Sequence, residues 1–273
     1  MMFNYINWDI SPIIFSFGAF QLRYYGLLFA LGFLIGYYIM EYIFKQENIP
    51  QSELSNISIA MILGTVIGAR LGHVLFYQPD YFLQNPLEIL MIWHGGLASH
   101  GGAIGILIAI WIYSKRSKRP YLWALDRISI PTALAGSFIR IGNLMNSEII
   151  GSPTSLPWGF KFLRYFDPEQ PIVNTIPRHP AQLYEAICYL IIFCILFYIY
   201  KKFKDKTPKG LLLGVFLISV FGVRFLIEFV KENQVPFENN MIINMGQLLS
   251  LPFIFVGIWL IYNVYVNKKQ SKV

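Results

Sequence analysis

The sequence has 273 residues, of which 55% are hydrophobic and 17% aromatic, and only 14% are charged. Soluble domains average about 25% charged residues, so the composition excludes an ordinary water-soluble protein and indicates an integral membrane protein. The net charge of +7 does not indicate a nucleic-acid partner, because the basic residues lie in short segments between apolar runs and not on one soluble face.

Several apolar runs approach the length of about 20 residues that crosses the hydrocarbon core of a bilayer. In chain order they are Tyr25–Phe44, Ile57–Tyr77, Ile89–Tyr113, Ile128–Met145, Ala181–Tyr200, Gly210–Val230 and Met241–Val264. We therefore expect an all-α fold, a polytopic membrane bundle of about seven transmembrane helices. No linker divides the chain, so residues 1–273 are predicted to form a single integral membrane domain.

Lys and Arg residues predict the orientation of this bundle. They are dense after the third run, after the fifth run and in the tail: Lys115, Arg116, Lys118, Arg119, Arg127, Lys201, Lys202, Lys204, Lys206, Lys209, Lys268, Lys269 and Lys272. Such segments face the cytoplasm. The opposite links hold only Lys161, Arg164, Arg178 and Lys231. The amino terminus is then outside, the carboxyl terminus is in the cytoplasm, and residues 151–180 form an ordered external loop.

The third run contains the sequence WHGGLASHGGAIG, in which glycines surround His94 and His100. Glycine-rich backbone is tolerated at membrane depth where it packs closely or lines a cavity, so a broken or tightly packed helix is expected. His100 is a candidate general base, because its ordinary pKa lets it accept a proton near neutral pH. Alternatively, the small residues only permit helix contact and the histidines bond across helices.

The fourth run ends in the sequence IRIGNLMNSEIIG, which places Arg140, Asn143, Asn146 and Glu148 in apolar surroundings before Gly151. A charged side chain at the centre of a membrane helix costs about 2.5 to 3.5 kcal/mol on insertion scales, so it faces a protein interior or a wet cavity. We interpret this stretch as the wall of a polar pocket. Just ahead of the run, Asp126 could cap the start of the helix.

Two further arginines lie inside apolar runs. Arg224 and Glu228 are four residues apart in the sixth run, so they share a helical face and could pair. Arg224 could bind a phosphate through its planar donor fork, or the two residues could form a purely structural ion pair. Arg70, in the second run, could extend to the membrane interface or reach a lipid head group.

Other candidates have simpler explanations. Tyr24 and Tyr25 begin the first run, where aromatic residues commonly mark the membrane interface. Glu185 lies deeper in the fifth run and is a stronger candidate for a site residue. Cys188 and Cys194 have no metal-ligand spacing and are predicted to be packing residues, so we expect no metal.

The candidate cations outnumber the candidate carboxylates, which favours an anionic ligand. In a membrane, the abundant anion is a phospholipid head group. The residues taken alone therefore predict a membrane-embedded anion site with a candidate base.

The stretch after Ile139 also resembles the signature of the prolipoprotein diacylglyceryl transferase family, Gly-Arg-x-Gly-Asn-Phe-x-Asn-x-Glu-x-x-Gly. Arg140, Gly142, Asn143, Asn146, Glu148 and Gly151 occupy the matching places, whereas Ile139 and Leu144 depart from the pattern without removing a donor or acceptor. The runs HGGLASHGGAIG, GARLG and HPAQLYE, the Tyr-Tyr-Gly of the first run and the helix from Arg224 to Glu228 are similar too. The resemblance covers nearly the whole chain.

This resemblance implies transfer of a diacylglyceryl group from phosphatidylglycerol to the lipobox cysteine of a prolipoprotein signal peptide, at the outer side of the bacterial cytoplasmic membrane. It implies no cofactor. His100 would activate the thiol, and Arg140 and Arg224 would hold the phosphate. Asn143 and Asn146 would donate hydrogen bonds, and Glu148 and Glu228 would orient the arginines. The residues expected to complete the substrate site are Tyr25, Arg70, Gly151 and Glu185.

Three other functions remain to be distinguished. A secondary transporter would also bury arginines and break helices, but it should show paired half-repeats, and the sequence shows none. A lipid-binding scaffold would need the cationic pocket but no base. A different phospholipid-dependent transferase would leave a lipobox peptide without a diacylglyceryl thioether.

Overall fold

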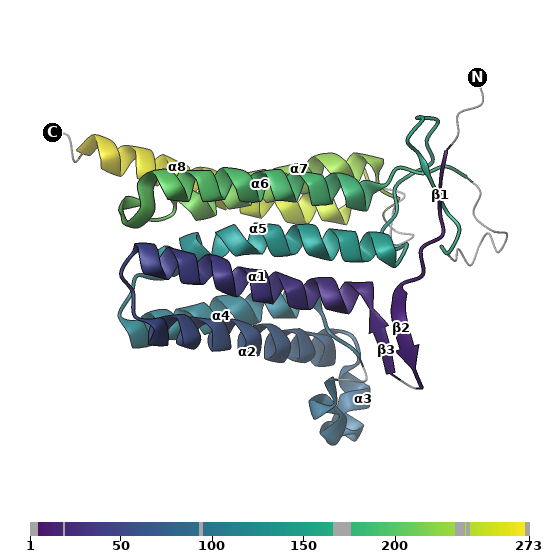
Figure 1. Cartoon of the computed structure of the whole chain (residues 1–273), viewed down its shortest axis with the longest axis horizontal. Helices are drawn as coiled ribbons and strands as arrows, with labels where there is room; N and C mark the ends of the chain where they lie inside the picture. The colour runs from purple at the N-terminus through teal and green to yellow at the C-terminus, as the bar shows by residue number, and fades with distance from the viewer. Residues whose placement is uncertain are drawn as a thin grey trace. The chain divides into compact units, whose positions relative to one another are not determined.

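The computed structural model describes residues 5–18, 20–92, 95–165, 176–232, 238 and 241–270. Within them the fold is mostly helical (Figure 1). The α-helices are α1 (Tyr24–Gln46), α2 (Gln51–Phe76), α3 (Pro79–Gln84), α4 (Ser99–Ser117), α5 (Tyr121–Met145), α6 (Ala181–Phe203), α7 (Leu211–Ile227) and α8 (Met245–Gln270). Short 3₁₀ turns are η1 (Pro86–Leu90), η3 (Lys204–Lys206) and η4 (Glu228–Val230), and the strands are β1 (Ile6–Trp8), β2 (Ile13–Phe17), β3 (Phe20–Arg23) and β4 (Phe160–Phe162).

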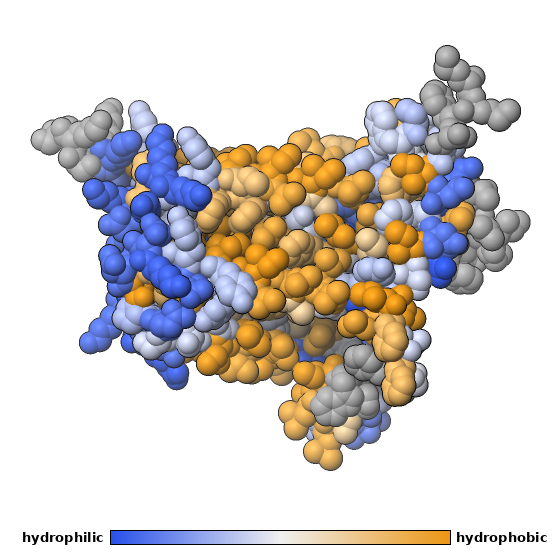
Figure 2. All heavy atoms as spheres, viewed as in Figure 1, coloured by the Kyte–Doolittle hydropathy of each residue, from blue (hydrophilic) through white to orange (hydrophobic). Residues whose placement is uncertain are grey.

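Five of the described helices are long and apolar enough to cross a membrane. They are Tyr24–Gln46, Gln51–Phe76, Ala181–Lys206, Leu211–Val230 and Met245–Lys268. On the face drawn in Figure 2, apolar side chains cover the middle of the helices and hydrophilic ones gather at the helix ends. The expected all-α, multi-pass membrane bundle is therefore confirmed, whereas the count of seven spans and the orientation remain predictions.

The third and fourth predicted spans have different boundaries in the structure. The segment predicted as one helix from Ile89 begins as the turn η1, and α4 starts only at Ser99. Gly95 and Gly96 have φ angles of 87° and 72°, a left-handed conformation that interrupts a helix and that glycine adopts readily. The helix is thus broken where its glycines cluster, as expected.

The helix α5 begins at Tyr121, seven residues before the predicted start at Ile128. Asp126 and Arg127 consequently lie inside this helix and are both fully buried, so the predicted helix cap and the predicted cytoplasmic-link arginine are wrong. The Nη2 of Arg127 lies 2.9 Å from Oε1 of Glu47. A carboxylate 80 residues away, which no local pattern reveals, allows the arginine to be buried.

The chain divides into two compact units, and residues 40–127 form one of them. In this unit α2 packs along α4 through facing glycines. A Cβ atom added at Gly68 would overlap the carbonyl oxygen of Gly101, and one added at Gly64 would lie 2.7 Å from that of Gly105. Such close backbone approach is how membrane helices gain packing without a hydrophobic driving force, and it confirms the predicted tight packing.

Residues 1–39 and 128–273 form the other unit. Within it α7 packs on α6 and α8, and the first part of α1 meets α5 where Gly32 faces Ala135. Serine 137 on α5 donates a hydrogen bond of 2.8 Å to the carbonyl oxygen of Ala186 on α6. These contacts align the polar positions of α5, α6 and α7.

The segment predicted as a loop after residue 151 contains β4, which pairs in parallel with β1 from the amino terminus. Leu144, Ile150, Phe160 and Phe162 form a buried cluster there, and Trp8 packs against it. The indole Nε1 of Trp8 donates to the carbonyl oxygen of Leu144 at 3.0 Å, which satisfies one of the free carbonyls at the end of α5. The amino-terminal strand thus covers the end of the polar stretch. Residues 166–175 of the predicted loop lie outside the described residues.

Candidate functional site

Arg140 lies near the end of α5 and turns toward α6. Its Nε is 2.9 Å from Oε2 of Glu185, and the two side chains are 16% and 0% exposed. Arg140 also forms a side-chain hydrogen bond with Tyr189, one turn further along α6. A buried guanidinium needs such partners because an unpaired charge in an apolar interior is very costly.

The other end of the Arg140 guanidinium meets the amides of the signature. Nη1 donates to Oδ1 of Asn143 at 3.4 Å, and Nδ2 of Asn143 donates to Oε1 of Glu148 at 2.7 Å. Nδ2 of Asn146 donates to the same Glu148 oxygen at 3.2 Å. Glu148 therefore reaches Arg140 through Asn143 and not directly, so the expected orienting contact is indirect.

The backbone after α5 explains how Glu148 returns over the helix. Ser147 and Ile149 have φ angles of 52° and 57°, a left-handed conformation that is unusual for residues other than glycine. The amide of Glu148 donates to the carbonyl oxygen of Asn143 at 3.1 Å. The turn thus stores strain at the residues that build the site, as is common at functional sites.

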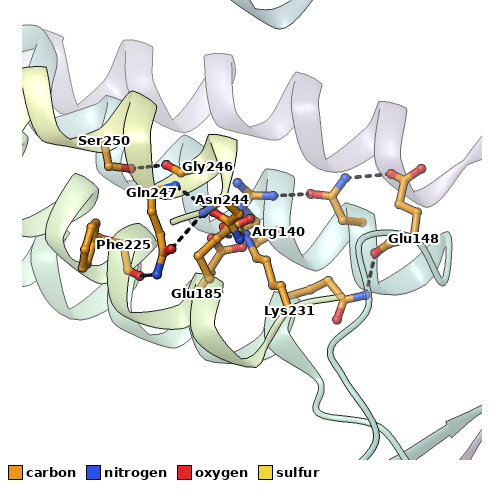
Figure 3. A network of polar contacts seen from close by, with 12 residues as sticks. Arg140, Glu148, Glu185, Phe225, Lys231, Asn244, Gly246, Gln247 and Ser250 are labelled. Carbon is orange, nitrogen blue, oxygen red and sulfur yellow. Dashed lines mark hydrogen bonds and ion pairs between the residues drawn. The ribbon is translucent and has the colours of Figure 1, made fainter. Parts of the chain in front are cut away.

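A lysine that sequence reasoning placed among the outer links belongs to this cluster. Nζ of Lys231 lies 2.9 Å from Oε1 of Glu185 and 3.1 Å from Oε2 of Glu228. Figure 3 shows the side chains of Arg140, Glu185 and Lys231 converging on one place. The spacing of three residues from Glu228 was the available signal, but the contact with Glu185 spans 46 residues.

Arg224 and Glu228 do not form the predicted ion pair. The helix α7 ends at Ile227, Glu228 begins the turn η4, and its carboxylate pairs with Lys231 instead. Arg224 interacts electrostatically with Tyr189, as Arg140 does. Its Nε is buried and makes no hydrogen bond with any residue that the structure describes. Arg224 therefore has a donor available for a ligand.

Two further signature positions act through shape. A Cβ atom at Gly142 would lie 2.8 Å from Cδ2 of Tyr25, so the glycine lets this ring of α1 pack against α5. Tyr25 interacts electrostatically with Glu148 and Arg140. A Cβ atom at Gly151 would lie 2.5 Å from Cβ of His179 and 2.7 Å from the carbonyl oxygen of Val230. Both glycines are thus required by close approach.

Arg70, in the unit of residues 40–127, is only 5% exposed and does not extend to the interface. Its donors reach backbone carbonyl oxygens: Ile89 at 2.9 Å, Gly95 at 2.6 Å, Gly96 at 3.2 Å, Met91 at 3.5 Å and Glu88. The guanidinium also lies 4.9 Å from the ring centre of Phe82. Arg70 therefore does not make the expected lipid contact, because carbonyl oxygens of the backbone between α3 and α4 already accept hydrogen bonds from its guanidinium group.

His100 is the second residue of α4, and its side chain is exposed. His94 lies outside the described residues. Within the described ranges, no three His, Cys, Asp or Glu side chains are grouped in a way that could hold a metal ion, and Cys188 and Cys194 are free thiols.

The network on α5, α6 and α7 balances its formal charges. Arg140 and Lys231 pair with Glu185 and Glu228, Glu148 meets Asn143, and Arg224 interacts with Tyr189. An anion binding here would engage the free donor of Arg224 and the edge of Arg140, and Glu185 would hold Arg140 in place before binding.

The comparison with known proteins decides the family. A model of the prolipoprotein diacylglyceryl transferase family matches residues 12–263. The chain belongs to this family. A relative in Chloroherpeton thalassium is 48% identical over 98% of both chains, and one in Porphyromonas gingivalis is 45% identical over 98% of both. A relative in Bacteroides fragilis is 41% identical over 97% of both chains, and all three are named phosphatidylglycerol–prolipoprotein diacylglyceryl transferase. As a member of the diacylglyceryl transferase family, the chain is a transferase and a multi-pass bacterial membrane protein.

Proposed function

We propose that the protein transfers the diacylglyceryl group of phosphatidylglycerol to the lipobox cysteine of prolipoprotein signal peptides. The observation that carries the proposal is the pair Arg140 and Arg224. Both interact electrostatically with Tyr189 within an apolar helix bundle, and Nε of Arg224 is buried without a hydrogen-bond partner among the described residues. Phospholipids of the surrounding bilayer carry an anionic phosphodiester. The planar donor fork of a guanidinium group matches the geometry of the phosphodiester oxygens.

The reaction needs a nucleophile and a stabilised leaving group. The cysteine thiol has an ordinary pKa near 8.5 and must lose its proton to attack. Its sulfur forms a bond to the glyceryl carbon while the bond from that carbon to the phosphate oxygen breaks, and glycerol phosphate leaves. Arg140 and Arg224 would stabilise the negative charge that develops on the leaving phosphate.

His100 is proposed as the group that accepts the thiol proton. Neutral imidazole is suited to this step near neutral pH. If His100→Asn retains near-normal transfer in membranes while the wild-type chain is active, another group must take the proton.

The remaining signature residues are proposed to shape the substrate site. Asn143 and Asn146 present amide donors, and Glu148, Glu185 and Glu228 hold the cations in place. Tyr25 and Gly151 fix the packing around them. For Arg70 we propose a structural contribution, because its donors are bound to backbone carbonyls.

We further propose that residues 1–273 work as one membrane domain of seven spans. Its amino terminus and residues 151–180 would face outward, its carboxyl terminus would lie in the cytoplasm, and the reaction would occur on the external side. The dense Lys and Arg residues after α4 and α6 support this orientation through the positive-inside rule.

The test is the mass of a lipobox peptide after incubation with the purified protein in vesicles that contain phosphatidylglycerol. A peptide heavier by one diacylglyceryl group, with release of glycerol phosphate, is expected. A peptide whose cysteine is replaced by serine, and vesicles of phosphatidylethanolamine alone, serve as controls. An unmodified peptide despite measurable binding of phosphatidylglycerol would point to a lipid-binding scaffold and contradict the transferase.

A further inference from the structure

We propose that Lys231 is a positioning residue of this site. Its ammonium bridges the two carboxylates that interact with Arg140, and it thereby keeps this guanidinium group available for the lipid phosphate. This inference rests on the proposed function. It adds Lys231, which lies outside the family signature at residues 139–151, to the residues of the site.

The geometry around Lys231 is that of a buried bridge. Its Nζ lies 2.9 Å from Oε1 of Glu185 and 3.1 Å from Oε2 of Glu228. The side chains of the three residues are 4%, 0% and 9% exposed. Buried charges of this kind persist only where they are paired with good geometry, so the ammonium and the two carboxylates depend on one another.

Glu185 divides its two oxygens between two cations. Oε1 lies against Lys231, and Oε2 lies 2.9 Å from Nε of Arg140. Glu228 also interacts electrostatically with Arg140. Without the ammonium, one oxygen of Glu185 and one of Glu228 would lose their partner. Both would then be attracted more strongly to Arg140 and would compete with a phosphate for its donors.

The backbone of Lys231 is fixed by the segment that follows the polar stretch. Lys231 and Gly151 form an antiparallel bridge, and Ser152 N donates to the carbonyl oxygen of Val230 at 2.9 Å. The amide of Glu232 donates to the carbonyl oxygen of Ile150 at 3.3 Å. The absence of a side chain at Gly151 permits this approach. The signature glycine therefore places the lysine.

The test compares three variants, Lys231→Met, Lys231→Gln and Lys231→Arg, in vesicles containing phosphatidylglycerol. The readouts are kcat and KM for the lipid, together with the rise in Tm that phosphatidylglycerol causes. The Tm readout needs no turnover, so it tests the inference even where no thioether forms and the proposed function fails. Lys161→Met is the matched control, because Lys161 lies in the same unit and makes no ion pair among the described residues.

We expect Lys231→Met to raise KM for phosphatidylglycerol by about tenfold or more, a size typical of coupling within one charged network. The lipid-induced rise in Tm should shrink with it. Lys231→Arg should recover most of the affinity, because it keeps a cation between the carboxylates. Lys231→Gln should resemble Lys231→Met, and it replaces that variant if Lys231→Met fails to accumulate.

Two results would overturn the inference. In the first, Lys231→Met and Lys161→Met bind and turn over the lipid equally well. In the second, Lys231→Met and Lys231→Arg lower Tm alike while KM and the lipid-induced rise in Tm stay at the wild-type values, which would mark a purely structural lysine.

Discussion

Arg70 and Arg140 are both arginines in apolar helices, but their surroundings differ in kind. Arg70 donates to the carbonyl oxygens of one backbone segment, so its charge is used to fold the connection between α3 and α4. Arg140 meets an amide from its own helix, α5, and a carboxylate and a hydroxyl from α6. A buried cation is therefore poor evidence for a ligand site until its partners are known.

The helices around them differ in the same way. The contact of α2 with α4 consists of glycine backbones in close approach. Where α5 meets α6, charged side chains hold one another: Glu185 pairs with Arg140 and with Lys231. The first arrangement fixes the fold, and the second presents functional groups.

The largest effect that distinguishes Arg140 from Arg70 is expected when Arg140 is replaced. Arg140→Ala should lower transfer by about a hundredfold to a thousandfold, the range seen when one pre-positioned donor to a developing anion is lost. Arg140→Lys keeps the charge but loses the planar fork, so it should remain strongly impaired. Product mass from a lipobox peptide measures both, and near-normal transfer by either variant would contradict the phosphate-binding role.

Replacing Arg70 should affect folding and not the chemistry. Arg70→Met leaves several partly buried carbonyl oxygens without a donor, and we expect the free energy of unfolding to fall by about 3 kcal/mol. The measurement is Tm in detergent, with KM for phosphatidylglycerol determined on the surviving protein. An unchanged Tm with a raised KM would show that Arg70 contacts the lipid after all.

The glycine contact can be probed with one methyl-bearing side chain. Gly68→Val would place a Cβ against the Gly101 carbonyl, and the overpacking should destabilise the protein by about 1 to 3 kcal/mol. Gly222→Val is the matched control, since nothing lies within 4 Å of its added Cβ. An equal effect of both substitutions on Tm would refute close packing as the reason for Gly68.

The smallest expected effect concerns pH. Burial lowers the pKa of His179, which precedes α6, below its ordinary value. Between the two pKa values the unfolded chain binds more protons, so stability should fall as pH drops below about 6.5. Tm measured from about pH 7.5 to about pH 5.5 should decrease more for the wild type than for His179→Gln. Equal slopes would show that His179 does not contribute.

Hydropathy predicted the helices that are apolar throughout, because the membrane imposes one length and one composition on them. It failed where a distant group changes the local outcome. Arg127 is buried because Glu47 reaches it, and Arg70 binds the carbonyl oxygens of Gly95 and Gly96, whose left-handed conformation interrupts the chain before α4. Neither partner lies within the window that a local pattern covers.

The site was predictable to the same degree. The polar stretch from Arg140 to Glu148 was evident, since charged and amide residues in an apolar run need a wet or protein-lined surrounding. Lys231 was missed because a lysine near a helix end usually extends to the interface. Lys231 is buried because it pairs with Glu185 and because its backbone pairs with that of Gly151, which has no side chain. Both contacts join residues far apart in the sequence.

The parallel pairing of β1 with β4 bears on the order in which the protein is built. Ile6 is synthesised before its partner Phe160, and α1 to α5 lie between the two in the chain. Such a long-range pairing is slow to form. The amino-terminal strand therefore cannot form this pairing until β4 has been synthesised, and the cover over the end of α5 closes only after α1 to α5 have been made.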